Sequence, residues 1–128
     1  MFLVGLSGAT TAMRSVIGPI RENAQTRAFL LDVMREVVAV GNAHGVDLAA
    51  DYAERRLALA DDVAHDMTSS MHHDLKRGRP LEIRWLSGGV VHLGNAMGVA
   101  TPLNRAIADM LALYEGGAPA PQEINHAG

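Results

Sequence analysis

The sequence predicts an all-α protein, a bundle of helices, and three observations favour that class. Apolar residues recur at steps of three and four along most of the chain, which is the period of a helix that packs on one face. Glycine or proline follows several of these periodic segments, where a helix is expected to stop. No segment alternates apolar and polar residues as a half-buried strand does. With 128 residues, 48% of them hydrophobic, the chain has the size of one domain with an aliphatic core.

The first segment, residues 1–14, is rich in small residues and carries no helix-start signal. We expect a helix that begins in mid-element and that permits close backbone approach, because its small residues include Gly5 and Gly8. Residues 15–23 predict a turn and a short helical piece, with Pro19 suited to a first helical position.

The strongest helical pattern covers residues 25–44, where apolar residues keep the helix period as far as Gly45. Asp47 then favours the start of another helix that runs to about residue 60. A short helix follows near residue 70. One of three hydroxyl residues begins it and a glycine ends it, these being Thr68, Ser69 or Ser70, and Gly78.

A further helix is expected over residues 81–97, and Gly98 is expected to end it. Thr101 and Pro102 form an N-cap and first-turn pair for the last helix, which presents one apolar face. The resulting domain organisation is a helical unit over residues 1–115 followed by a flexible tail over residues 116–128, which is rich in glycine and proline.

Composition excludes several classes of protein. The net charge of −3 and the lack of a basic patch argue against a nucleic-acid partner. The chain has no cysteine, so it has no disulfide framework, and we expect a cytoplasmic protein. No apolar run approaches the roughly 18 residues of a membrane span, so no membrane partner is expected. The apolar start lacks the preceding basic residue of a signal peptide.

Candidate functional side chains crowd into residues 69–83, "SSMHHDLKRGRPLEI". His72 and His73 are adjacent and diverge by about 100° on a helix, so we expect solvent-facing histidines and no metal site. The serines lack the strand–turn–helix elbow of a nucleophile, and serines at a helix start are typical caps.

A different interpretation fits the spacing of the residues in this segment better. Ser70 and Asp74 are four residues apart, so they share one face of a helix and offer it a hydroxyl and a carboxylate. Glu82 stands at the entrance of the next predicted helix. From the residues alone, Glu82 either caps that helix or faces a cleft, and both interpretations remain open.

At these residues the chain resembles a known family. The segment "TSSMHHDLKRGRPLEIRWLSGGVVHLGNAMGVATPLNRAI" is similar to the C-terminal domain of ketopantoate reductase (2-dehydropantoate 2-reductase), whose fold is like that of the 6-phosphogluconate dehydrogenase C-terminal domain. That family shows a Ser-Ser-Met-x-x-Asp run, a Glu after a short basic loop, an Asn-Gly or similar pair, and Gly-Val-x-x-Pro. The matching positions here are Ser69, Ser70, Met71, Asp74, Glu82, Ser87, Gly88, Gly98, Val99 and Pro102.

The resemblance implies an activity and roles for particular residues. The family reduces the ketone of 2-dehydropantoate, a small 2-oxo acid, to pantoate with NADPH in pantothenate biosynthesis. A Rossmann domain holds the cofactor, a lysine donates the proton, and a glutamate assists it. By this resemblance Glu82 is the catalytic glutamate and Ser70 the substrate-binding serine, with Asp74 and Ser69 in support.

The chain also departs from the family pattern. It contains no GxGxxG, the catalytic lysine aligns just before Met1, and the positions of two expected asparagines are taken by Val4 and Gly8. We therefore expect the substrate-binding half of an oxidoreductase, a chain that binds no NADPH and does not turn over alone. We also expect a homodimer formed through surfaces that include the first helix. The alternative is a stand-alone dimeric helical interaction module with no catalysis.

Overall fold

The computed structural model describes residues 2–117 and is entirely helical over that range apart from turns and loops, which confirms the all-α prediction. Eight α-helices and two short 3₁₀-helices occur in this order: α1 (Phe2–Met13), α2 (Ile17–Glu22), α3 (Ala24–Ala43), α4 (Tyr52–Leu57), α5 (Leu59–Asp62), α6 (Ser70–Lys76), η1 (Ile83–Trp85), α7 (Ser87–Met97), α8 (Pro102–Leu111) and η2 (Ala112–Tyr114).

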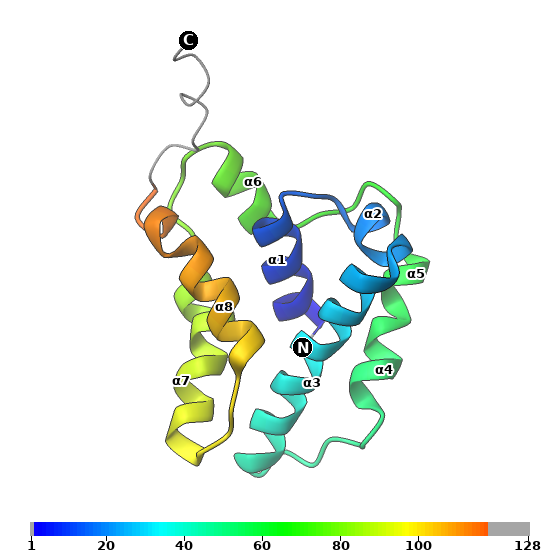
Figure 1. Ribbon diagram of the computed structural model, residues 1–128, viewed down its shortest axis with the longest axis vertical. Helices are drawn as coiled ribbons and strands as arrows, with labels where there is room; N and C mark the ends of the chain where they lie inside the picture. The colour runs from blue at the N-terminus through cyan, green and yellow to red at the C-terminus, as the bar shows by residue number, and fades with distance from the viewer. Residues whose placement is uncertain (1, 118–128) are drawn as a thin grey trace.

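The helices form a bundle around α1 and α3. Figure 1 shows α7 and α8 side by side on one flank of this central pair, and α4 and α5 on the other. Helix α6 lies across one end of the bundle against α1, while α2 returns the chain from α1 to α3. No helix within residues 2–117 is both long enough and apolar enough to cross a bilayer.

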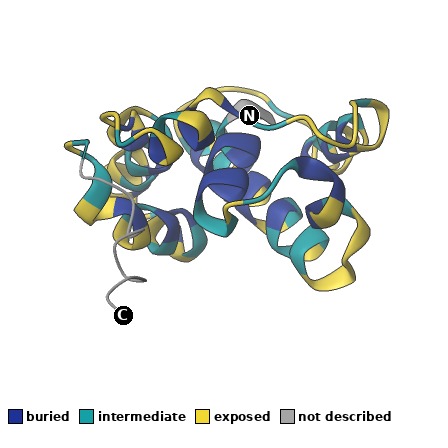
Figure 2. Ribbon diagram, turned by 90° about the horizontal axis from the view of Figure 1, so that it is seen from above, coloured by how far each residue is buried: buried dark blue, intermediate teal, exposed yellow. Residues whose placement is uncertain are grey.

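Helix α1 is buried on every side along residues 5–11. Its small residues make this possible: a Cβ added at Gly5 would lie 2.8 Å from Met34 Cγ, and one added at Gly8 would lie 3.0 Å from Ile107 Cδ1. Figure 2 accordingly shows the buried residues gathered along the middle of the bundle, with the exposed residues around its rim. The predicted close backbone approach is therefore confirmed.

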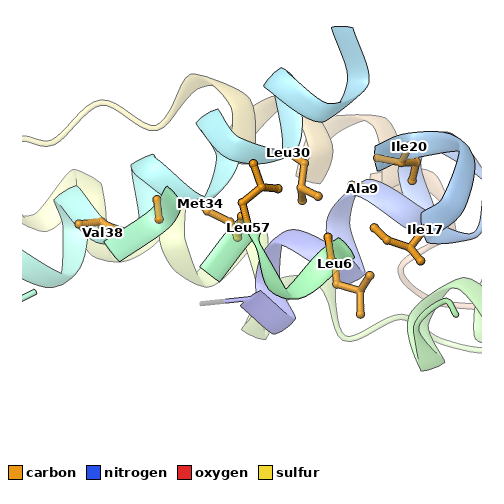
Figure 3. Close-up of a cluster of buried hydrophobic side chains, with 10 residues drawn as sticks. Leu6, Ala9, Ile17, Ile20, Leu30, Met34, Val38 and Leu57 are labelled. Carbon is orange, nitrogen blue, oxygen red and sulfur yellow. The ribbon is translucent and has the colours of Figure 1, made fainter. Parts of the chain in front are cut away.

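Two clusters of buried side chains fill the bundle, and α3 contributes to both of them. The first has members from each of the helices α1 through α5 and is drawn in Figure 3, where Leu6 of α1 and Leu30 and Met34 of α3 are labelled among them. The second joins α3 to α6, η1 and α8 and contains Val33 and Ile107. Each large apolar side chain buried in this way contributes about 1.5–3 kcal/mol.

Several predicted boundaries are confirmed. Helix α3 begins and ends within one residue of its prediction, and α6 begins at one of the expected hydroxyl residues. Glycines follow α3, α6 and α7 with φ values of +91°, +69° and +70°, at Gly45, Gly78 and Gly98. This left-handed conformation costs glycine little, which is why it ends helices so often.

Other boundaries were predicted wrongly. Asp47 does not begin a helix, because the Leu48 amide donates to Asn42 Oδ1 at 2.9 Å and holds the chain over the end of α3. The next helix starts only at Tyr52 and is broken at Ala58, between α4 and α5. Pro19 occupies the third position of α2 rather than the first.

The predicted helix over residues 81–97 is also interrupted. Leu86, with φ −109° and ψ −103°, separates η1 from α7. The turn is tight, because a Cβ added at Gly88 would lie 2.9 Å from the Ile83 carbonyl oxygen. The predicted tail lies outside the described residues from residue 118 onward.

The start of α8 is capped from a distance. Thr101 occupies the N-cap position as predicted, but its side chain makes no capping hydrogen bond. The Glu36 carboxylate of α3 accepts instead from the amides of Leu103 and Asn104 at 2.8 and 2.9 Å. It also accepts from Asn104 Nδ2 at 2.8 Å, so three hydrogen bonds join α3 to the first turn of α8.

Candidate functional site

The start of α6 is built around Ser69, which is buried. Its Oγ accepts the amide of His72 at 3.2 Å and so caps the helix. Ser69 Oγ also lies 2.7 Å from Thr10 Oγ1. Because the Thr10 hydroxyl donates to the Leu6 carbonyl at 2.6 Å, the Ser69 hydroxyl is the donor to Thr10. Ser69 therefore fixes α6 to α1.

Ser70, the predicted substrate-binding residue, is the first residue of α6 and is exposed. Its hydroxyl makes no hydrogen bond to any residue in the described range, since the capping role belongs to Ser69. Asp74, predicted to share its face, is half-buried one turn further along α6. At the start of α6, the Ser69 hydroxyl is therefore buried, whereas the adjacent Ser70 hydroxyl faces solvent.

Glu82, the predicted catalytic residue, stands at the N-cap position of η1 and is exposed. Its side chain makes no capping hydrogen bond, so the capping interpretation of this carboxylate is wrong. The loop before Glu82 is held at two points: the Arg79 amide donates to the Asp74 carbonyl at 2.9 Å and the Leu81 amide to the Glu115 carbonyl at 3.0 Å. Within residues 2–117 no hydrogen bond or ion pair engages the Glu82 carboxylate.

No hydrogen bond joins Ser70, Asp74 and Glu82 to one another within the described chain, so their joint role stays a prediction. The position where the resemblance expects an asparagine, Gly8, faces Ser87 at the start of α7. A Cβ added at Gly8 would lie 3.1 Å from Ser87 Oγ, which is itself buried without a partner. The two residues therefore pack closely, and α1 approaches the start of α7 at this point.

The burial of His72 was not predicted from the sequence. His72 and His73 were expected to face solvent; His73 is exposed as expected, whereas His72 is buried. The reason is its spacing from the cap, because a residue three positions after Ser69 lies on the same inner face. Burial lowers the pKa of His72, and the charges of Lys76, His73 and Arg14 lower it further.

A metal site finds no support in the part of the chain that the structure describes, where no three histidine, aspartate or glutamate side chains gather. The rings of His72 and His73 stack with their centroids 6.3 Å apart and do not converge on one point.

Comparison with known proteins identifies the family. Residues 1–115 match the family model described as "Ketopantoate reductase PanE/ApbA C terminal". The chain is 29% identical over 110 residues to a 2-dehydropantoate 2-reductase of Pyrobaculum aerophilum, covering 86% of this chain and 39% of that protein. It is 30% identical over 105 residues to a 2-dehydropantoate 2-reductase of Caulobacter vibrioides, covering 82% of this chain and 36% of that protein.

The fold agrees with these sequence matches. A dimeric ketopantoate reductase from Staphylococcus aureus superposes with a TM-score of 0.82 at 21% identity, covering 89% of this chain and 40% of that one. The chain thus spans about two fifths of the length of the relatives it matches. It belongs to the family of ketopantoate reductase C-terminal domains.

Proposed function

We propose that this chain is the substrate-side domain of an NADPH-dependent reductase that acts on 2-dehydropantoate or a related 2-oxo acid. The observation that carries the proposal is the family match over residues 1–115, with relatives that are 2-dehydropantoate 2-reductases. The exposed, unengaged side chains of Ser70 and Glu82 support it, because they are the two positions that match the family's substrate-side pair.

Ser70 is suited to hold the substrate. Its hydroxyl is exposed and has no internal partner in the described chain, so it is available to donate to a carboxylate or keto oxygen. Ser69, directly before it, is used by the fold as a cap and gives α6 a fixed start. Asp74, one turn along, supports the polarity of the same face.

Glu82 is suited to assist proton transfer. Reduction of a ketone places negative charge on the carbonyl oxygen, which needs a positioned proton donor. In the proposal that donor is the family's lysine, contributed by residues outside these 128, and the Glu82 carboxylate orients it. The carboxylate has no ion-pair partner within residues 2–117 that would compete for this role.

NADPH supplies the hydride in this proposal, and the residues described here do not fit it. A dinucleotide is held where a glycine-rich turn joins a strand to a helix, and residues 2–117 contain no strand. We therefore assign no residue of this chain to the cofactor. A titration followed by NADPH fluorescence should show no micromolar binding to the chain alone, and micromolar binding would contradict this view.

Exposed apolar side chains favour a second candidate, a stand-alone dimeric module without catalysis. Trp85 is 76% exposed and Leu113 is 82% exposed. Trp85 also borders a cavity of about 470 Å³ that reaches along α7 to Leu93. Such apolar surface promotes association, and we propose a homodimer in either case. Light scattering behind a sizing column tests it, and a monomer at high concentration would contradict it.

The experiment that separates the two candidates joins this chain to a nucleotide-binding domain. The nucleotide-binding domain of the Caulobacter relative, with its lysine, is joined ahead of Met1, and NADPH oxidation is followed with 2-dehydropantoate. The proposal expects substrate-dependent oxidation above that of the nucleotide-binding domain alone. A fusion that folds and binds NADPH but reduces no 2-oxo acid would favour the dimeric module.

A further inference from the structure

A cavity of about 350 Å³ lies between the end of α1 and the side of α6. Two permanent cations, a buried imidazole and two aliphatic side chains form its walls, and none of its lining residues is acidic. The lining residues are Arg14, Ser15, Val16, His72, Leu75 and Lys76. The combination of positive charge with aliphatic surface is typical of a site for a small organic anion.

The two cations of this cavity have no counter-ion in the described chain. The ion pairs found within residues 2–117 engage other basic side chains, and neither Arg14 nor Lys76 takes part in one. The Arg14 guanidinium instead lies over the ring of Tyr114, 5.8 Å from its centroid. That contact satisfies none of the guanidinium N–H donors with a hydrogen-bond acceptor.

A simpler explanation is that both cations compensate helix C-termini, and two facts oppose it. Each helix end carries about half a negative charge, so two ends offset roughly one of the two positive charges. Two of the end carbonyls of α1 are also already paired, since the Thr10 carbonyl accepts the Ser15 amide at 3.0 Å and the Thr11 carbonyl accepts the Arg14 amide at 3.2 Å. Positive charge therefore remains available to a ligand.

The backbone at Arg14 is unusual. Its φ of +50° makes it the one non-glycine residue with positive φ among residues 2–117. The two hydrogen bonds just described place Arg14 at the left-handed position that ends a helix, where glycine is the preferred residue. An arginine is strained there, and such strain is commonly found at binding sites.

His72 supplies a third polar group to the cavity. Its Nδ1 lies 2.7 Å from Thr68 Oγ1, which fixes the orientation of the ring. Its Nε2 makes no hydrogen bond to a residue that the structure describes, so it is free to face a ligand. When the Thr68 hydroxyl donates to Nδ1, the neutral ring carries its proton on Nε2 and is a donor.

We propose that this cavity binds the oxyanion, carboxylate or phosphate, of a small molecule between Arg14 and Lys76. Any aliphatic part of that molecule would rest against Val16 and Leu75. Neither Ser70 nor Glu82 lines the cavity, so this proposal does not depend on the proposed function.

The test is a nuclear magnetic resonance titration of the chain at constant ionic strength, once with inorganic phosphate and once with 3-methylbutanoate. Saturable shifts at His72 and Lys76 with either anion support the proposal, and the anion that binds more tightly identifies the source of the oxyanion. Shifts that appear equally with sodium chloride, or that do not saturate at these residues, would overturn it.

Variants separate binding from folding. Lys76→Met should weaken binding about tenfold, as expected for loss of one charge-assisted hydrogen bond. Arg14→Gly should weaken it similarly while the melting temperature is retained, because glycine adopts the left-handed backbone without strain. Arg79→Met is the matched control, since it removes an exposed cation near Lys76 but outside the cavity. Wild-type binding by Lys76→Met, or an equal loss in Arg79→Met, would overturn the proposal.

Discussion

The helices α6 and α8 begin in different ways, although both follow a hydroxyl residue at the N-cap position. Ser69 caps α6 with its own side chain and also bonds Thr10 on α1. Thr101 stands at the same position of α8 and makes no capping hydrogen bond. The first turn of α8 is satisfied by Glu36, which is 67 and 68 residues away from its partners in sequence.

A hydroxyl residue before a helix therefore does not by itself show which group caps that helix. A local cap needs only neighbouring residues and is readable from sequence. A carboxylate from another helix can take over the same donors, and it then joins two elements of the fold as well as capping one. The same contrast explains why the Ser70 hydroxyl makes no hydrogen bond within the described residues: Ser69, directly before it, makes the capping bond.

Among the variants at these two helix starts, Glu36→Ala is expected to lower the free energy of unfolding most. The change removes three hydrogen bonds to the start of α8 and leaves their donors unsatisfied, so the free energy of unfolding should decrease by about 2–4 kcal/mol. Urea denaturation measures it. Glu54→Ala, which removes an exposed carboxylate paired with Arg35, is the control and should change the stability far less. Equal effects would mean that α8 does not depend on Glu36.

Ser69→Ala is expected to have the next largest effect. It removes the cap of α6 and the buried bond to Thr10, so the free energy of unfolding should decrease by about 1–2 kcal/mol. Ser70→Ala should stay within about 0.5 kcal/mol, because its hydroxyl is exposed. Thermal denaturation of the two variants under the same conditions measures the difference in stability. A larger loss in Ser70→Ala would reverse the assignment of the cap.

A pH-dependent effect should follow from His72. Burial, together with the nearby charges of Lys76, His73 and Arg14, holds its pKa below the ordinary value of about 6.5. Below pH 6.5 the unfolded chain binds a proton that the folded chain does not. The contribution to stability is therefore complete above pH 6.5 and is lost as the pH falls toward the folded pKa.

Denaturation of His72→Gln and of the wild type between pH 7.5 and pH 5 measures this contribution. The wild type should lose more stability than the variant over that range. His73→Gln, which changes the exposed neighbouring histidine, is the control. An unchanged pH dependence in His72→Gln would show that the ring protonates as easily in the folded chain as in the unfolded one.

A smaller loss of stability than that of Ser69→Ala is expected at Thr101. Its side chain caps nothing, so Thr101→Ala should lower the free energy of unfolding by less than Ser69→Ala does, on the order of 0.5–1 kcal/mol for its buried methyl group. Thermal denaturation beside Ser69→Ala measures the difference. A loss equal to that of Ser69→Ala would indicate that Thr101 caps α8 in solution.

Much of the fold was predictable because the signals are local. The boundaries of α3 follow from its apolar period and from Gly45. The start of α7 was not predicted, because the break that sets it falls at Leu86, where no glycine or proline stands. Asp47 failed as a cap for a similar reason, since Asn42 and Leu48 decide where the chain turns.

The candidate site was predictable only in part. Ser70 and Glu82 were chosen by resemblance to a family, and the family itself is confirmed. Which of two adjacent serines faces inward was not readable, because Thr10, 59 residues from Ser69, decides it. The burial of His72 depends on the same contact, which is why this histidine was misjudged.

The proposed role of Glu82 in a reductase is tested most directly by one kinetic comparison. In the fusion that supplies the nucleotide-binding domain and its lysine, kcat for 2-dehydropantoate is measured for Glu82→Gln and for Asp62→Asn, which alters another exposed carboxylate. We expect Glu82→Gln to lower kcat by roughly 10²–10⁴-fold, as for an acid–base group, while Asp62→Asn leaves it unchanged. An active fusion in which Glu82→Gln retains the full kcat would contradict the proposed role of Glu82.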